Sequence, residues 1–143
     1  VVDAGGGIAR AIIGELMAGR ARLRGVHGIV IDGAVRHADA LATGPLHVFA
    51  RGTTPAGPYK SGPGWLHAPV TIGGIVVEDG DLVVGDGDGI VIVPRQRLET
   101  AVLDGEAIAA REAQRLTDLD AGHLSDSAVV AGANVVMVAP DPS

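Results

Sequence analysis

The sequence of 143 residues contains no cysteine, which excludes disulfide bonds and thiolate metal sites within it. Aromatic residues are almost absent, with one each of Phe, Tyr and Trp, so a core must be built from Val, Ile, Leu and Ala. Such a composition favours β-structure rich in branched side chains. No apolar run approaches the roughly 18 residues that cross a membrane, and no signal peptide is visible. We therefore expect a cytoplasmic protein that does not contact a membrane.

Basic residues are also scarce, since 11 Lys and Arg stand against 17 Asp and Glu and give a formal charge of −6. No basic cluster interleaved with aromatic residues is present, so we expect no nucleic-acid partner. A small anionic substrate would need a local positive pocket. The five histidines lack HxxxH or HxH spacing, which argues against a zinc site built from histidines.

The length fits a single domain spanning residues 1–143. We expect residues 1–94 to form a β-rich core with one helix, residues 95–116 a C-terminal helix, and residues 117–143 a weakly patterned tail. The start "VVDAGGG" predicts a strand end followed by a sharp turn, because glycine tolerates the backbone angles that such a turn needs.

Helix formers run from Glu15 to Arg24, between Gly14 and Gly25, and predict the helix of the core. "GVHGIVID" then predicts a buried strand, "HADAL" one helical turn at most, and "LHVFA" the next strand.

The segment "RGTTPAGPYKSGPG", Arg51 to Gly64, has three prolines and four glycines and is expected to be a loop throughout. Long loops of this kind are often functional. Four short β-rich runs follow it, "WLHAPV", "GGIVV", "DLVVG" and "GIVIV", and are expected to form a compact sheet or barrel that ends at Pro94. We expect Asp86 and Asp88 of "GDGDG" to form a turn.

Two features suggest an anion site. "GELM", Gly14 to Met17, places free N–H groups at the predicted helix start, although every helix shares this feature. Arg36 follows a buried strand, where a guanidinium can hold a carboxylate by two parallel hydrogen bonds. The alternative for Arg36 is a structural ion pair with an acid such as Asp32 or Asp39.

His37 and Lys60 have several interpretations. His37 fits a metal ligand, an acid–base group or a solvated turn residue. Lys60 is the only lysine of the Pro/Gly loop and, beyond Arg51, the nearest cation for a ligand there; the alternative is an ordinary exposed lysine.

The stretches "VVDAGGG", "GELMAGRARLRGVHGIVIDGAVR", "FARGTTPAGPYKSGPG", "PVTIGGIVVEDGD" and "DGDGIVIVP" together resemble the RraA-like family. That family includes 4-hydroxy-4-methyl-2-oxoglutarate aldolases, related oxaloacetate decarboxylases and regulators of RNase E. The resemblance covers Val1 to Leu116 and implies an α/β fold, a swivelling β/β/α domain with a central β-rich core and flanking helices. It also implies trimers or hexamers with active sites between neighbouring subunits. Family members carry a segment before "VVDAGGG", so we expect this chain to lack the family's N-terminal segment.

The resemblance implies a substrate site. In the family's aldolases an acid on the first helix is followed, after twenty intervening residues, by Arg-Asp, then two residues and a further acid. Glu15 and Arg36 match this pattern, and Ala40 replaces the further acid. The segment matching Gly14, Glu15, Leu16 and Met17, together with the arginine matching Arg36, binds the pyruvyl part of the substrate.

The resemblance also implies a divalent cation, Mg²⁺ or Mn²⁺, bound by the aspartate after that arginine. Here this position is His37, with Glu15 expected to reach the metal through water. An imidazole suits Mn²⁺, Co²⁺ or Zn²⁺ better than Mg²⁺, which prefers oxygen ligands. Lys60 and Glu112 fall where the family has a loop lysine and a glutamate that reaches a neighbouring subunit's site.

These correspondences imply a divalent-metal-dependent lyase that cleaves a small 2-oxo acid to pyruvate, with Glu15, Arg36, Lys60 and Glu112 as catalytic residues. One alternative is a non-catalytic regulator that binds a partner protein through its acidic surface. Another is an inactive family fragment. The sequence does not decide among the three.

Overall fold

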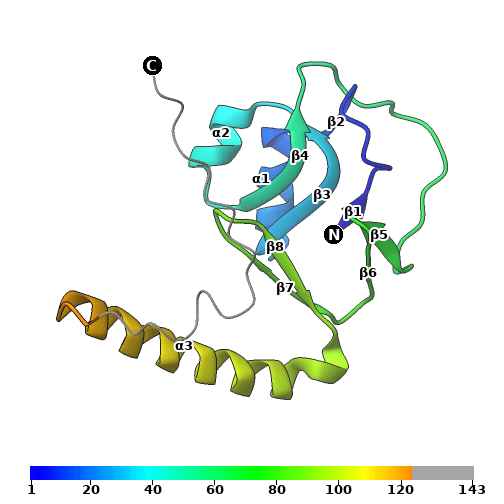
Figure 1. Cartoon of the computed structure of the whole chain (residues 1–143). Coiled ribbons are helices and arrows are strands. Elements are labelled where there is room, and N and C mark those ends of the chain that lie inside the picture. The colour runs from blue at the N-terminus through cyan, green and yellow to red at the C-terminus, as the bar shows by residue number, and fades with distance from the viewer. Residues whose placement is uncertain (124–143) are drawn as a thin grey trace, which may run out of the picture. The chain divides into compact units, whose positions relative to one another are not determined.

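The computed structural model describes residues 1–123, and the chain divides into two compact units, Val1–Leu98 and Glu99–Ser143. The first unit holds all the strands of the described residues and two of their α-helices, and the second is described through the helix α3 (Figure 1). Each unit is described by itself.

A parallel four-stranded sheet forms the centre of the first unit. Its middle strand β3 (Gly28–Val35) pairs along one edge with β4 (His47–Thr53). On the other edge it pairs with two short strands, β1 (Val2–Asp3) and β2 (Ala11–Ile13). A central strand of a parallel sheet is commonly rich in apolar residues, and "GIVI" at the start of β3 has this composition.

Two helices connect the parallel strands, because a parallel connection needs a crossover segment. Helix α1 (Glu15–Leu23) joins β2 to β3, and α2 (Ala38–Thr43) joins β3 to β4. Both pack on the sheet around one small core, and its buried members are Ala18, Ile31, Val35, Leu41 and Leu46. The helices therefore cover one face of the sheet.

The glycine turn after β1 is confirmed. Gly5 and Gly6 adopt φ angles of 66° and 71°, in the left-handed region that favours glycine. The N–H of Gly5 donates to Asp3 Oδ1, and the N–H of Gly6 donates to the carbonyl of Asp32. The turn thereby joins β1 to the middle of β3.

The remaining strands form two separate antiparallel pairs. These are β5 (Val70–Ile72) with β6 (Ile75–Val77), and β7 (Leu82–Gly85) with β8 (Ile90–Val93). The prediction of one compact sheet or barrel is therefore wrong, because strand patterns give the hairpins but not how hairpins associate. Asp86 closes the β7–β8 turn by accepting from the N–H groups of Asp88 and Gly89, as predicted.

Several helix and strand boundaries differ from the predicted ones. The first helix ends one residue before the predicted Arg24, whereas α2 is six residues long instead of one turn. Residues 1–94 therefore contain two α-helices, whereas only one was predicted from the sequence. β4 continues to Thr53, so the first part of the predicted loop is strand, because Gly52 and Thr53 pair with the end of β3. "WLHAPV" becomes strand only at Val70.

The C-terminal helix of the prediction begins as a 3-10 turn at Arg95–Arg97 and continues as α3 (Leu98–Asp120). α3 runs through Gly105 without a break, ends beyond the predicted Leu116, and has no buried residue. Residues from 124 onward in the predicted tail lie outside the described residues. Within residues 1–123, no helix combines the length and apolarity needed to span a membrane.

Candidate anion-binding site

The candidate site lies where the parallel strands β2, β3 and β4 end. Arg36, directly after β3, donates its backbone N–H to the carbonyl of Ile13, the last residue of β2, at 3.0 Å. Thr54, directly after β4, donates to the carbonyl of Val35 at 3.0 Å. These bonds bring Gly14, Arg36 and the loop of residues 54–69 to one edge of the sheet. Carboxyl ends of parallel strands are frequent ligand sites.

The side chain of Arg36 lies directly across Gly14, the N-cap residue of α1. A Cβ atom placed on Gly14 would be 2.9 Å from Arg36 Cγ and 3.3 Å from its Nε. The Nε atom is buried and has no hydrogen-bond partner among residues 1–123. A buried donor without a partner is costly, which indicates a group that a ligand completes.

The start of α1 adds further donors beside Arg36. Gly14 has no side chain to cap the helix, and its carbonyl accepts from the N–H groups of Met17 and Ala18. The N–H groups of Glu15 and Leu16 precede these and have no acceptor within the helix. The positive end of the helix dipole and the guanidinium therefore both favour an anion at this point.

Glu15 and His37, which the sequence predicted to act together, are brought together. His37 Nδ1 lies 4.0 Å from Glu15 Oε2, and the two side chains are 48% and 63% exposed. His37 adopts φ 58° and ψ 47°, a left-handed conformation that is uncommon outside glycine and is often found at functional sites. Its position directly before α2 holds the imidazole beside α1.

The donor set at this pair is one carboxylate and one imidazole. No cluster of three or more His, Cys, Asp or Glu side chains suited to a metal exists within residues 1–123. Mg²⁺ commonly keeps several waters and uses only one or two protein carboxylates. Glu15 and His37 thus fit a cation whose other ligands are water and substrate.

The other predicted site residues lie on other elements. Lys60 is exposed on the 54–69 loop, six residues after Thr54. Glu112 is exposed on α3, in the second unit. Their roles remain predictions.

The alternative for Arg36, a structural ion pair with Asp32, is not formed. Asp32 pairs instead with Arg51, whose Nε lies 2.5 Å from Asp32 Oδ1. The hydrogen bond from Arg51 lowers the pKa of the Asp32 carboxyl, and the carboxylate in turn raises the pKa of Arg51. No salt bridge of Arg36 occurs within the described part of the chain. Arg51 is thereby neutralised, whereas Arg36 keeps its full charge for a ligand.

Sequence analysis did not identify three residues at the site. Arg10 donates from Nη1 to the carbonyl of Gly57 at 2.9 Å, and its guanidinium carbon lies 4.4 Å from the ring centroid of Tyr59. A Cβ atom on Gly57 would be 3.5 Å from Arg36 Nη1. Arg10 belongs to "IARAII", which carries no recognisable motif, so only the fold reveals these contacts.

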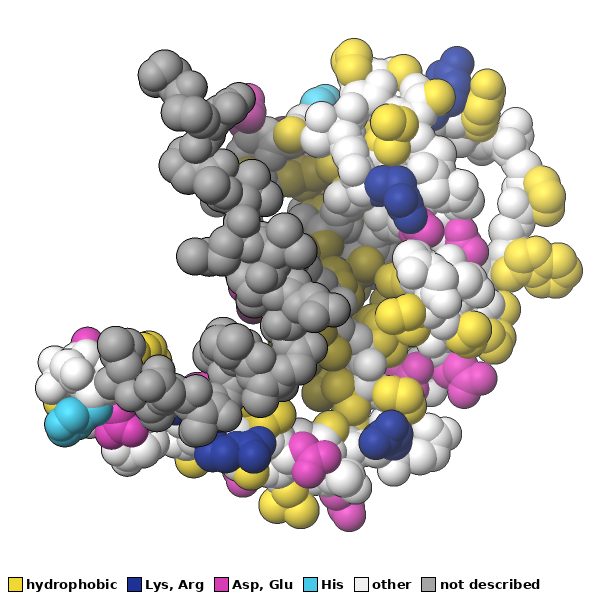
Figure 2. All heavy atoms as spheres, in the orientation of Figure 1, with side chains coloured by type: hydrophobic (Ala, Val, Ile, Leu, Met, Phe, Trp, Pro, Cys, Tyr) yellow, Lys and Arg dark blue, Asp and Glu magenta, His cyan; other side chains and the backbone are white. Residues whose placement is uncertain are grey.

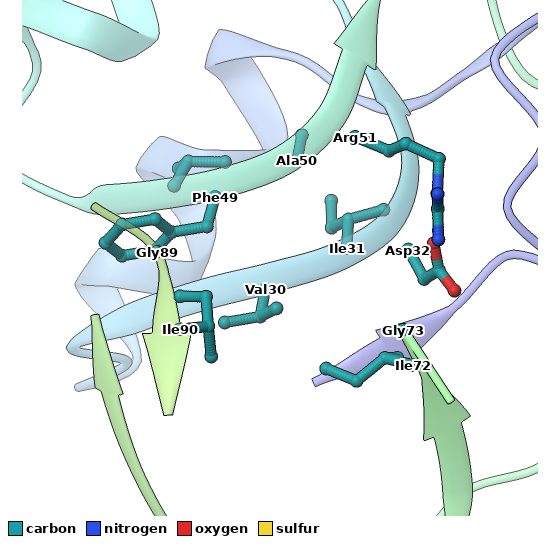
Figure 3. Close-up of a pocket in the computed structure, with 11 residues that line it drawn as sticks. Val30, Ile31, Asp32, Phe49, Ala50, Arg51, Ile72, Gly73, Gly89 and Ile90 are labelled. Atoms are coloured by element: carbon teal, nitrogen blue, oxygen red, sulfur yellow. The ribbon is translucent and has the colours of Figure 1, made fainter. Parts of the chain in front are cut away.

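One sizeable hollow of the first unit lies elsewhere. It has a volume of about 520 Å³ and shares no residue with the site around Gly14, Arg36 and His37. Figure 3 shows apolar side chains lining it, with Arg51 and Asp32 directed toward one another at one end. Because its one cation is already paired with an acid, this hollow is a poorer anion site than the edge at Arg36.

Comparison with known proteins identifies the family of the chain. The family described as "RraA-like: Aldolase/RraA" matches residues 1–92. A curated protein of Halalkalibacterium halodurans, named "Putative 4-hydroxy-4-methyl-2-oxoglutarate aldolase", is 39% identical over 102 residues. The match covers 71% of this chain and 49% of that protein, so the chain spans about half of its length.

Solved structures agree with the fold. An uncharacterized protein from Pseudomonas syringae superposes with a TM-score of 0.77 at 29% identity, over 86% of this chain and 62% of that one. The RNA-processing inhibitor RraA from Thermus superposes with a TM-score of 0.61 at 33% identity, over 65% of this chain and 58% of that one.

Proposed function

We propose that this chain, which belongs to the RraA-like family, acts as a lyase that cleaves a small 2-oxo acid and releases pyruvate. The observation that carries the proposal is the Arg36 side chain, which lies across the start of α1 with a buried, unpartnered Nε within the described residues. The aldolase name of relatives at 38–39% identity supports the same reaction class.

Substrate binding begins with its carboxylate. The guanidinium of Arg36 and the N–H groups of Glu15 and Leu16 together offer donors on two sides of one anion. A carboxylate held between them has a fixed orientation, since two parallel N–H donors define its plane. We place the adjacent 2-oxo group toward Glu15 and His37, because Glu15 is the first residue of α1 and His37 directly follows Arg36.

Cleavage requires that the electron pair of the C–C bond move toward the 2-oxo group. The leaving fragment is carbon dioxide from oxaloacetate, or a second pyruvate from 4-hydroxy-4-methyl-2-oxoglutarate once the hydroxyl proton is removed. Protonation of the remaining three-carbon enolate gives pyruvate. Glu15 is exposed at the start of α1, beside the proposed position of the substrate, so it is suited to move these protons. Lys60 and, from another subunit, Glu112 are the other candidates for proton transfer.

A divalent cation held by Glu15 and His37 would supply Lewis acidity toward the 2-oxo group. With one imidazole among its ligands, the site suits Mn²⁺ or Co²⁺ better than Mg²⁺. This preference is part of the proposal.

A second candidate function is regulation through protein binding. Two observations favour it, namely His37 at the position of the family's metal-binding aspartate and the 33% identity to a protein titled an RNA-processing inhibitor. The formal charge of −6 would provide an acidic surface for such a partner.

A pyruvate-release assay separates the two candidates. Oxaloacetate and 4-hydroxy-4-methyl-2-oxoglutarate are each incubated with the protein and Mg²⁺, Mn²⁺ or EDTA, and pyruvate is measured continuously. We expect turnover with Mn²⁺ above that with Mg²⁺ and none with EDTA. Because metal ions alone decarboxylate oxaloacetate, each rate is compared with the same mixture lacking protein.

Arg36→Ala is the informative variant in this assay. Removal of a charge-assisted hydrogen-bonded pair should lower kcat/KM by roughly ten- to a hundred-fold, and Arg36→Lys should restore only part of it. Protein-dependent turnover that is absent under every condition would contradict the lyase and leave the regulator or an inactive family fragment.

A further inference from the structure

Two arginines from different elements meet at one glycine of the loop. Arg10, just before β2, donates to the carbonyl of Gly57, and Arg36, just after β3, has its Nη1 3.5 Å from where a Cβ atom of the same residue would lie. The bond lengths of one residue then limit the distance between the two Nη1 atoms to about 10 Å.

Neither guanidinium is neutralised within the described residues, although the sequence holds 17 acids. Like charges at this separation repel each other, and an anion placed between them removes the repulsion. Arg10 has used one of its five N–H donors on Gly57, so its remaining donors are available to a ligand.

The contact with Tyr59 holds Arg10 in place. The guanidinium carbon lies 4.4 Å from the ring centroid, a cation–π distance. The Tyr59 ring against the face of the Arg10 guanidinium and the Gly57 carbonyl at its edge restrict the orientation of the guanidinium before any ligand binds. A group oriented in advance loses less entropy when it binds an anion.

We infer that Arg10 is a specificity residue that binds the distal carboxylate of a dicarboxylate substrate, while Arg36 binds the carboxylate beside the 2-oxo group. This inference rests on the proposed function, since it assigns the substrate class of the same site. The two carboxyl carbons of a four- or five-carbon dicarboxylate lie about 4–5 Å apart, so two guanidinium groups whose Nη1 atoms lie within about 10 Å of each other can each reach one carboxylate.

The test compares two ligands of matched length. 2-Oxoglutarate carries a distal carboxylate, whereas 2-oxopentanoate has a methyl group at that end. Calorimetric titration of the full chain should show 2-oxoglutarate binding about ten- to a hundred-fold more tightly, the size expected for one charge-assisted pair. Neither titration depends on turnover.

Two variants at Arg10 separate ligand binding from loop support. Arg10→Ala removes both the charge and the bond to Gly57, whereas Arg10→Gln removes the charge and the contact with Tyr59 but retains a shorter side chain with an amide donor that can be directed at Gly57. Both should reduce the preference for 2-oxoglutarate to less than about three-fold and leave the affinity for 2-oxopentanoate unchanged. Arg36→Ala should lower the affinity for both ligands by a similar factor. Arg20→Ala, which removes an exposed arginine of α1, is the matched control and should change neither.

Three outcomes would overturn the inference. These are equal affinities in the unchanged protein, no binding of 2-oxoglutarate, or a loss in Arg10→Ala that Arg10→Gln restores, which would make Arg10 a support of the loop. A preference that depends on Arg10 in a protein without pyruvate release would retain this inference and contradict the lyase. Pyruvate release without such a preference would support the lyase and contradict the role of Arg10.

Discussion

At the residue scale, His37 combines an unusual backbone with an unusual side chain. Its left-handed conformation places the imidazole 4.0 Å from Glu15, where the resemblance implies an aspartate. Aspartate is enriched several-fold in left-handed positions, so an aspartate at residue 37 fits the same backbone. The backbone at residue 37 therefore accepts either the histidine of this chain or the aspartate that the resemblance implies.

The substitution His37→Asp should strengthen the binding of Mg²⁺. A carboxylate at this position stands beside that of Glu15, and two adjacent anions repel each other unless a cation binds between them. We expect Mg²⁺ affinity, measured by calorimetric titration, to rise at least about ten-fold because oxygen replaces nitrogen. Mg²⁺-dependent pyruvate release should rise with it.

The control for this substitution is His27→Asp. It makes the same change of side chain at an exposed residue between α1 and β3 and should alter neither Mg²⁺ affinity nor activity. A folded His37→Asp variant with unchanged Mg²⁺ affinity would show that residue 37 does not contact the cation.

At the element scale, the start of α1 is matched closely to Arg36. Gly14 has an extended backbone, φ −146° and ψ −170°, which any residue adopts, so its glycine is not needed for the turn. What glycine provides is room, because a Cβ atom would lie 2.9 Å from Arg36 Cγ. The position of the Arg36 side chain therefore depends on the absence of a side chain at Gly14.

Gly14→Ala should therefore displace Arg36 without unfolding the helix. We expect oxalate binding, measured by calorimetry, to weaken about ten-fold or more, since the charge-assisted contact with the anion loses its alignment. The melting temperature should change little, because the backbone at residue 14 is unstrained.

Gly19→Ala provides a control within the same helix. No atom lies within 4 Å of a Cβ at that position, so the change acts only on backbone entropy. It should stabilise the protein by about 0.5–1 kcal/mol and leave oxalate affinity unchanged. Equal oxalate affinity in both variants would contradict the packing of Arg36 on Gly14.

At the scale of the whole molecule, the core is small and much apolar surface is exposed. Only nine hydrophobic residues are buried within residues 1–123, and all are Ala, Val, Ile or Leu. Trp65 and Leu66, on the loop that follows the site, are 89% and 90% exposed. Figure 2 shows apolar side chains spread over the visible face of the first unit. Exposed apolar surface of this extent is typical of proteins that associate.

We propose that the chain associates into a trimer or hexamer. Light scattering coupled to size exclusion should give at least three times the mass of 14.4 kDa. Because association stabilises the folded state by mass action, the melting temperature should fall on dilution. A monomer whose melting temperature does not depend on concentration would contradict both this assembly and a role for Glu112 at a neighbouring site.

The sequence by itself determined the family, the α/β class and the local features of short range. Gly14 before a run of helix formers gives α1, the three glycines give the turn after β1, and Asp86 gives the β7–β8 turn. These features depend on backbone preferences within a few residues, so they can be predicted from local sequence. The candidate site residues Glu15, Arg36 and His37 were predicted chiefly from the resemblance to the family, and their roles stay predictions.

Tertiary structure decided what long-range pairing controls. β4 extends into the predicted loop because it pairs with β3, and Asp32 pairs with Arg51, nineteen residues away, instead of with Arg36. Arg10 and Gly57, separated by 47 residues, meet because β2 lies beside the end of β3 and the loop after β4 folds against the start of β2, where the N–H of Ala11 donates to the carbonyl of Ala56. No local preference encodes such a meeting, since it depends on where the sheet brings distant segments together.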